Sequence, residues 1–287
     1  MQMEYSAADI GAARDLQFLA YIYISTATFW TYDFVCSLHE EWTFLLRSRW
    51  TKVKGLYIIT RYIPFVVIFL ELWLSLAKNE PKNCQILSNI FAYFGVISLA
   101  LSEFFFVLRT YALWNNKRIV LVAVLSGYFA VIISCIGILA PAGPFPDATI
   151  GPVQGVQGCS QSPQGFQLFL PFVLVFVFQV GLICLTITRA IQRWRLVKGP
   201  LFAILVKHNI FYYACGLLFS AMNFLLPLLL GDMFAVYSAI EAFQILILAI
   251  LATRMHLHLW HAEQYVNGSE GLVYISLSDM QPVNGAA

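Results

Sequence analysis

The sequence predicts an all-α integral membrane protein, a bundle of seven transmembrane helices. Hydrophobic residues make up 60% of the 287 residues, and charged residues make up only 11%. Soluble domains usually have about 45–50% apolar and about 25% charged residues, and a chain of this length in water would need more polar side chains to cover its surface. The apolar residues also gather in long runs, as the spans of a membrane protein do.

Seven runs have the length of about 17–25 mostly apolar residues that a bilayer-spanning helix needs. In chain order they are 16–38, 55–77, 87–114, 119–140, 166–188, 202–230 and 233–253. Only Gly231 and Asp232 separate the last two runs. Gly-Asp is a turn signal, and one helix across both runs would be about twice the bilayer thickness. We therefore expect a tight helical hairpin there.

Polar and small residues recur at helical spacing on several spans, which predicts the sides on which the helices face one another. Span 1 has residues three or four positions apart at Tyr23, Thr26, Trp30, Asp33 and Ser37. Span 6 repeats the spacing at Asn209, Tyr213, Gly216, Ser220 and Asn223. Such positions let helices approach closely and form hydrogen bonds, so they indicate packing sides before they indicate function.

The distribution of Lys and Arg predicts the orientation. The loops after spans 1, 3 and 5 and the position after span 7 hold eleven of these residues, whereas the N-terminal tail and the other loops hold three. Short loops rich in Lys and Arg stay on the cytoplasmic side. We therefore expect the tail 1–15 to be extracellular and the tail 254–287 to be cytoplasmic.

Two ionisable residues at matching depth predict an intramembrane ion pair. Asp33 lies about five residues from the inner end of span 1, and Arg61 lies about six residues into span 2 from the same side. Ionisable side chains at membrane depth usually face the bundle interior and pair with one another. The pair could serve only as a packing clamp between neighbouring helices.

Four polar residues on four spans predict a ligand pocket. Glu71, Asn223 and Glu241 lie in the outer halves of spans 2, 6 and 7, and Gln179 lies near the middle of span 5. Their convergence on one cavity would give the few polar groups that a small-molecule site between helices needs. The alternative is a closed core in which the acids are protonated or bonded to each other.

Two cysteines lie in the loops assigned to the outside, where a disulfide would persist. A Cys84–Cys159 bridge would tie the start of span 3 to the long loop 141–165. With Arg109 at the inner end of span 3, this layout resembles that of rhodopsin-like G-protein-coupled receptors. Arg109 and Glu103 are then the candidates for a switch at the cytoplasmic end. The match is in layout only, because the acid-Arg-aromatic triplet and the Asn-Pro-x-x-Tyr sequence of those receptors are missing.

Nothing in the sequence predicts an enzyme. There is no Walker A, G-x-G-x-x-G or G-x-S-x-G sequence, and the five histidines are too few for the multi-histidine boxes of membrane desaturases. We expect no catalytic residue, no metal and no cofactor. The formal net charge of +2 also argues against a nucleic-acid partner.

The N-terminal part resembles a known family. The elements Tyr32-Asp33 and Arg61-Tyr62-Ile63-Pro64 are similar to the N-terminal domain of unknown function in a group of uncharacterised multi-pass membrane proteins from basidiomycete fungi. The resembling domain covers about residues 16–77. The resemblance implies the same membrane architecture, and it lends no catalytic residue because that family has no established activity.

Together these features predict a receptor-like membrane protein that senses a small or lipidic ligand. Its expected surroundings are the lipid bilayer of the plasma membrane or an endomembrane, and its expected partner is a heterotrimeric G protein or another cytoplasmic effector. A transporter or channel, or a membrane scaffold without a ligand, are the alternatives. A transporter would show repeats and helix breaks in matched spans, and no convincing repeat is visible.

Overall fold

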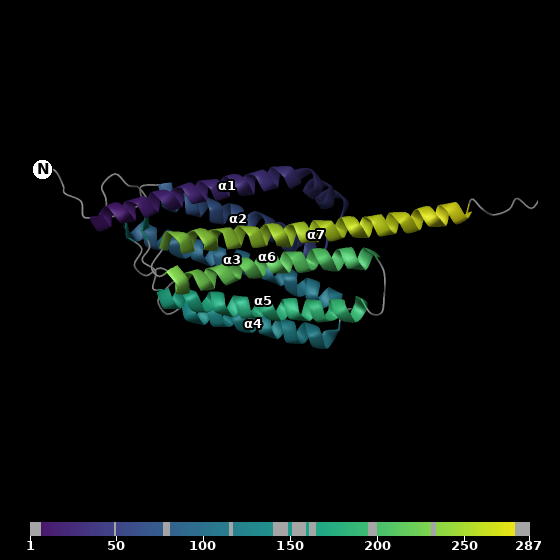
Figure 1. Ribbon diagram of the computed structural model, residues 1–287. Coiled ribbons are helices and arrows are strands. Elements are labelled where there is room, and N and C mark those ends of the chain that lie inside the picture. Colours follow the sequence, from purple (N-terminus) through teal and green to yellow (C-terminus); the bar gives the residue numbers. More distant parts are fainter. Residues whose placement is uncertain are drawn as a thin grey trace, which may run out of the picture.

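The computed structural model describes residues 7–48, 50–76, 81–114, 117–139, 149–150, 159–160, 165–194, 200–230 and 234–278. Within these residues the predicted all-α fold class is confirmed. Seven helices follow one another: α1 (Ala7–Arg47), α2 (Lys52–Leu76), α3 (Pro81–Leu113), α4 (Arg118–Leu139), α5 (Gly165–Trp194), α6 (Pro200–Leu230) and α7 (Phe234–Ser278) (Figure 1). Two short strands, β1 (Thr149–Ile150) and β2 (Cys159–Ser160), form an antiparallel pair between α4 and α5.

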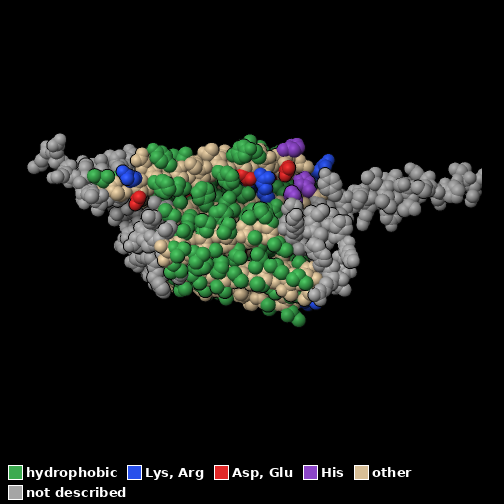
Figure 2. Space-filling view, viewed as in Figure 1, with side chains coloured by type: hydrophobic (Ala, Val, Ile, Leu, Met, Phe, Trp, Pro, Cys, Tyr) green, Lys and Arg blue, Asp and Glu red, His purple; other side chains and the backbone are tan. Residues whose placement is uncertain are grey.

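The helices are long and apolar enough to make this a membrane protein. Five of them contain stretches that could cross a bilayer, namely Lys52–Leu76, Asn83–Leu113, Arg118–Ile138, Leu170–Gln192 and Val236–His261. In α6 the described side chains include the apolar stretch Ile210–Leu226. Large hydrophobic side chains such as Phe69, Ile133 and Leu218 are exposed. Figure 2 shows such side chains covering the middle of the visible face, as expected of a surface that faces lipid tails.

Helix α1 is less apolar than the others because charged residues and hydroxyl-bearing residues are both frequent in it. Their hydroxyl groups are nevertheless satisfied within the helix. Ser25, Thr26, Thr28 and Thr31 each donate a hydrogen bond of 2.7–2.8 Å to the carbonyl oxygen four residues earlier. Such back-bonding removes the need for water, so α1 can pack in the bundle and against lipid despite its composition.

The helices form a closed ring in chain order. Each helix contacts its neighbours in the sequence, and α7 also contacts α1. Two helices lie further inside, since α3 also contacts α5 and α7, and α7 also contacts α2. The N-terminal end of α1 and the C-terminal end of α7 lie at opposite ends of the bundle (Figure 1), as an odd number of crossings requires. A site inside this bundle therefore includes side chains of α3 and α7.

Both terminal helices extend beyond the predicted spans. Span 1 was expected to end at 38, but α1 continues to Arg47 because Glu41 and Phe44 are buried against neighbouring helices. Lys54 then caps its last turn: the buried Nζ donates to the carbonyl oxygens of Leu45 at 2.7 Å and Ser48 at 2.8 Å. Helix α7 likewise continues to Ser278, past the expected span end at 253.

A close approach of α6 and α7 depends on one glycine. A Cβ atom at Gly216 would lie 2.9 Å from Cδ2 of Leu248, a fully buried side chain. We expect Gly216→Leu to destabilise the protein by about 1–3 kcal/mol, because overpacking forces neighbouring side chains or helices to move. Gly181→Leu on α5 is the matched control, since nothing lies within 4 Å of its Cβ position.

Thermal unfolding of the purified protein in detergent measures this difference. The Gly181 variant should retain the wild-type melting temperature, and only the Gly216 variant should lose stability. Equal effects at both positions would mean that the close approach of α6 and α7 is not what the glycine provides.

Candidate functional site

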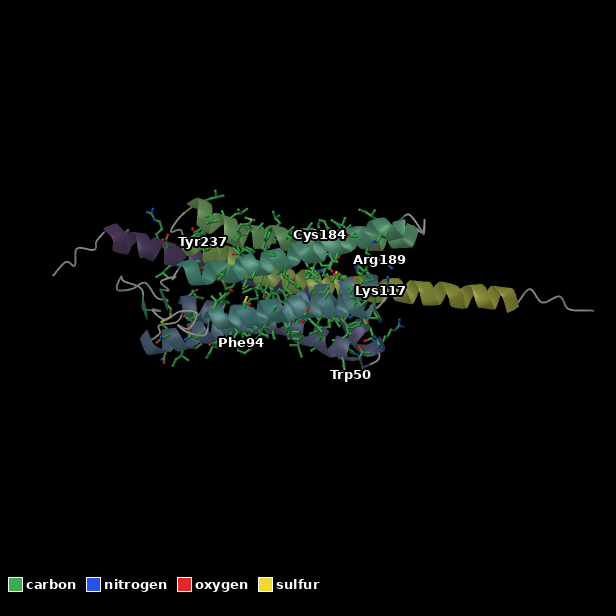
Figure 3. The ribbon with its side chains drawn as sticks, turned by 90° about the horizontal axis from the view of Figure 1, so that it is seen from below. Trp50, Phe94, Lys117, Cys184, Arg189 and Tyr237 are labelled. Atoms are coloured by element: carbon green, nitrogen blue, oxygen red, sulfur yellow. A yellow bond between two sulfur atoms is a disulfide. The ribbon has the colours of Figure 1, made fainter. Side chains whose placement is uncertain are left out.

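A cavity lies between α3, α4, α5 and α7. Its volume is about 100 Å³. Lining residues Gly95 and Glu241 are close in the sequence to Phe94 and Tyr237, which lie towards one end of the bundle, whereas Trp50, Lys117 and Arg189 lie towards the other (Figure 3). The cavity therefore occupies the half of the bundle away from the basic loops.

The cavity has a polar side and an apolar side. The polar side chains Glu103, Glu241 and Gln244 come from α3 and α7. Helices α4 and α5 contribute mainly apolar and aromatic side chains, among them Val131, Phe172 and Phe178. The hydroxyl group of Tyr128 is already used, since it donates 2.8 Å to the carbonyl oxygen of Ala100. Few polar groups in a mostly apolar lining are typical of small-molecule sites.

Glu103 is the most buried acid of the cavity, with 4% of its surface exposed. Gln179 on α5 donates its amide Nε2 to Oε1 of Glu103. The other carboxylate oxygen, Oε2, is buried and has no hydrogen-bond partner among the described residues. A buried polar atom without a partner is unfavourable, so Glu103 has an unused acceptor at the cavity wall.

Gln244 belongs to a hydrogen-bonded group that joins α7 to α6. Its Nε2 donates a hydrogen bond of 2.7 Å to Ser220 Oγ, and its Oε1 accepts a hydrogen bond from Asn223 Nδ2. All three side chains are buried. Because both ends of the Gln244 amide have partners, this residue is held in one orientation and forms a fixed part of the wall.

The four residues predicted to form one ligand pocket are distributed over several groups. Glu241 lines the cavity, whereas Gln179 and Asn223 each lie one hydrogen bond behind a lining residue. Glu71 lines a separate cavity of about 30 Å³ with Tyr23 and Cys159. The two acids Glu71 and Glu241 still interact electrostatically across α2 and α7. The sequence thus found the region but not which side chains line the cavity.

The Asp33–Arg61 pair forms and belongs to a larger network that joins α1, α2 and α7. Arg61 Nη1 lies 2.9 Å from Asp33 Oδ2, and Arg61 Nη2 lies 2.6 Å from Glu41 Oε1. Arg254 on α7 reaches the other oxygen of Asp33, with Nη2 2.7 Å from Oδ1. Ser37 Oγ donates 2.8 Å to Glu41 Oε1. The sequence predicted two members of this network and missed Glu41 and Arg254.

Aromatic rings enclose the arginine of this network. The Arg61 guanidinium carbon lies 5.1 Å from the centre of the Trp30 ring and 5.4 Å from that of Phe34. Aromatic faces attract cations, more strongly where water is excluded. Only 1% of the Arg61 side chain is exposed, against 40% for Arg254. Arg61 is therefore the buried centre of the network, and Arg254 approaches it from the surface.

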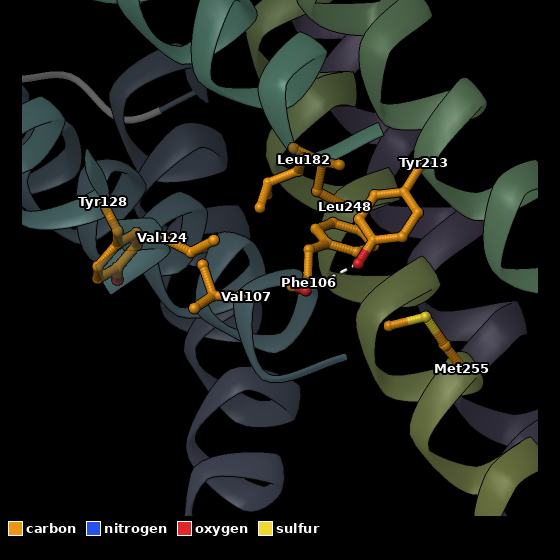
Figure 4. Close-up of a cluster of buried hydrophobic side chains, with 8 residues drawn as sticks. All are labelled: Phe106, Val107, Val124, Tyr128, Leu182, Tyr213, Leu248 and Met255. Carbon is orange, nitrogen blue, oxygen red and sulfur yellow. Dashed lines mark hydrogen bonds between the residues drawn. The ribbon is translucent and has the colours of Figure 1, made fainter. Parts of the chain in front are cut away.

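The two switch candidates on α3 have different partners. Arg109 Nη2 lies 2.9 Å from Nδ1 of His256 on α7, while Glu103 bonds to Gln179. A hydrophobic cluster lies between the Glu103–Gln179 contact and the Arg109–His256 contact. Its members are Phe106, Val107, Val124, Tyr128, Leu182, Tyr213, Leu248 and Met255 (Figure 4). Within it, Tyr213 donates 2.7 Å to the carbonyl oxygen of Phe106 and pairs with Thr110 at 2.9 Å.

The structure contains the Cys84–Cys159 disulfide, with Cα atoms 5.7 Å apart. Both cysteines are buried in a hydrophobic cluster with Val67, Leu70, Leu74, Phe91 and Ile245. Cys159 lies in β2, so the bridge fixes the paired strands to the start of α3. No group of His, Cys, Asp and Glu that could hold a metal ion occurs in the part of the chain that the structure describes.

Residues 21–66 match a protein family described as "Family of unknown function (DUF6533)". Comparisons with curated proteins and with solved structures give no match. The matched segment contains most of the ionic network, namely Trp30, Asp33, Ser37, Glu41 and Arg61. The cavity between α3, α4, α5 and α7 lies outside the segment. The chain is thus a helical membrane protein with an N-terminal segment similar to a family that has no assigned function.

Proposed function

We propose that this protein is a receptor-like membrane protein that binds a small or lipidic ligand in the cavity between α3, α4, α5 and α7. One observation carries this proposal: the polar cavity residues sit on the two helices that also carry the contacts at the other end of the bundle. Glu103 and Arg109 are both on α3, and Glu241 and Arg254 are both on α7. A ligand in the cavity that moved α3 relative to α7 would therefore also change the contacts of Arg109 and Arg254 at the other end of the bundle.

The hydrophobic cluster beneath the cavity favours a receptor over a transporter. Phe106, Leu182, Leu248 and Met255 are almost fully buried between the cavity and the Arg109–His256 contact. A transport route needs polar or hydrated groups along the way, and these side chains interrupt it. We assign the protein no catalytic step, and we propose a heterotrimeric G protein or another cytoplasmic effector as its partner.

We also propose that the N-terminus is outside and the C-terminus inside, in the plasma membrane or an endomembrane. Two independent features support this orientation. The disulfide indicates an oxidising compartment, and its Cys84 lies at the end of α3 away from Lys117 and Arg189. Basic loops remain in the cytoplasm. The cavity would then lie in the outer half of the membrane.

A pair of substitutions on α4 tests the proposed function. Val131 lines the cavity, whereas Ile133, two residues on, is 68% exposed on the outside of the bundle. We expect a small amphipathic molecule from a ligand panel to activate a G protein or recruit arrestin in cells that express the full chain. Val131→Trp should raise its half-maximal concentration at least about tenfold by filling the cavity, while Ile133→Trp should leave it unchanged.

The same panel is measured for flux into proteoliposomes. Flux of a panel member without any effector response would replace the receptor by a transporter. An effector response that Val131→Trp leaves intact would place the ligand elsewhere and contradict the proposed site.

A further inference from the structure

Two acids line one side of the cavity, and apolar side chains line the other side. Glu103 and Glu241 line it from α3 and α7, opposite Val131, Phe172, Val175 and Phe178 of α4 and α5. None of the described residues that line the cavity is Lys, Arg or His. Among the described residues of the wall, the two carboxyl groups therefore have no basic side chain beside them.

From this arrangement we propose that the ligand is a small cation: a protonated amine held between Glu103 and Glu241, with a short apolar body against α4 and α5. This inference deepens the proposed function and rests on it. Acids at membrane depth normally pair with a cation, and a bound ammonium group is the partner that this cavity lacks. Its N–H groups would donate to the unpartnered Oε2 of Glu103.

A neighbouring side chain orients Glu103 for such a ligand. The amide of Gln179 bonds to Oε1 of Glu103 and so directs the carboxylate, leaving Oε2 for a donor from the cavity. Glu241 is half-buried, on the same helix as the fixed Gln244. Among the described residues of the wall, the other titratable groups are the buried thiol of Cys135 and the hydroxyl group of Tyr128, which is already bonded to Ala100. Specificity for a cation therefore falls to the two acids.

The size of the cavity limits the apolar body. An engineered cavity of about 150 Å³ holds benzene, and this cavity measures about 100 Å³. A chain of about four carbon atoms is therefore a suitable probe. Three four-carbon probes of similar size carry head groups of different charge: n-butylamine is a cation, 1-butanol is neutral and butyrate is an anion.

Calorimetric titration of the full-length protein in lipid nanodiscs tests the inference, with empty nanodiscs subtracted. We expect n-butylamine to bind at least about tenfold more tightly than 1-butanol, and butyrate to bind more weakly than both, since a hydrogen bond to a charged group is worth more than one between neutral groups. This comparison uses the wild-type protein and does not depend on how any variant folds.

Three substitutions locate the effect. Glu103→Gln and Glu241→Gln keep the side-chain volume and remove the charge, so each should abolish the preference for the amine over the alcohol. Glu40→Gln is the control for removing an acid, because Glu40 is exposed on α1 and lines neither cavity. It should leave the preference unchanged.

The outcomes separate this inference from the proposed function. Equal binding of amine and alcohol, with both lost in Val131→Trp, would overturn the cation and leave the cavity as the ligand site. An amine preference that survives both cavity substitutions would overturn the role of the two acids. Failure of all three probes to bind the wild-type protein would overturn the cation inference, and the ligand panel would still decide the proposed function.

Discussion

Arg61→Leu is expected to lower the stability of the protein by about 3–5 kcal/mol, because it leaves buried carboxylates without their cation. Asp33 and Glu41 both contact Arg61 and are 8% and 2% exposed. Arg254 could still neutralise Asp33, but among the described residues Glu41 would keep only the hydroxyl group of Ser37 as a hydrogen-bond partner. Thermal unfolding in detergent should show a melting temperature lower by about 10 °C.

A compensating variant separates the lost charge from lost packing. Replacing Arg61 by Leu together with Glu41→Gln removes the acid that would be left alone, so this double variant should recover a large part of the stability. Arg118→Leu is the control for removing an arginine, since Arg118 is exposed at the start of α4. Wild-type stability in the single Arg61 variant would show that the network does not stabilise the fold.

Removing the disulfide is the second change with a large expected effect. The bridge closes a loop across 75 residues, for which chain entropy alone gives about 4 kcal/mol. Helices that stay in the membrane after unfolding restrict the conformations of the unfolded chain, so the bridge removes less entropy than this figure implies. We therefore expect Cys84→Ser to lower the free energy of unfolding by about 2–4 kcal/mol. The fully buried Cys84 side chain also packs against Phe91 and Leu74, which adds to the loss.

Melting temperatures measured with and without a reducing agent check this expectation. The reductant should lower the melting temperature of the wild type and leave that of Cys84→Ser unchanged. Cys36→Ser is the control, because Cys36 is a free, exposed thiol on α1. A Cys84 variant that unfolds at the wild-type temperature would mean that the bridge contributes nothing to stability.

The sequence predicts depth in the membrane well, because each residue of a helix adds a fixed rise. Asp33 and Arg61 lie at one depth on helices joined by a short loop, and they form an ion pair. The sequence does not show how far a helix continues beyond the membrane. A span that ends at 38 puts Glu41 in a loop, and Arg254 counts only as a topology signal, yet both lie on extended helices and reach the network.

The direction in which a side chain points is harder to predict than its depth. Each residue turns a helix by about 100°, so a small difference in helix rotation moves a side chain from one cavity to another. Glu71 and Glu241 both belong to the outer half, but they line different cavities. Glu103 and Arg109 are both candidates for the switch at the cytoplasmic end, but six residues separate them by about 9 Å along the axis of α3, and they have different partners.

The ionic network has a consequence for the order in which the protein assembles. Within the segment 21–66, the network has two acids, Asp33 and Glu41, and one cation, Arg61. The second cation, Arg254, is made 188 residues after the segment ends. The network therefore has one more acid than cation until α7 docks and Arg254 reaches Asp33. Helix α7 thus completes an ionic network that begins in α1 and α2.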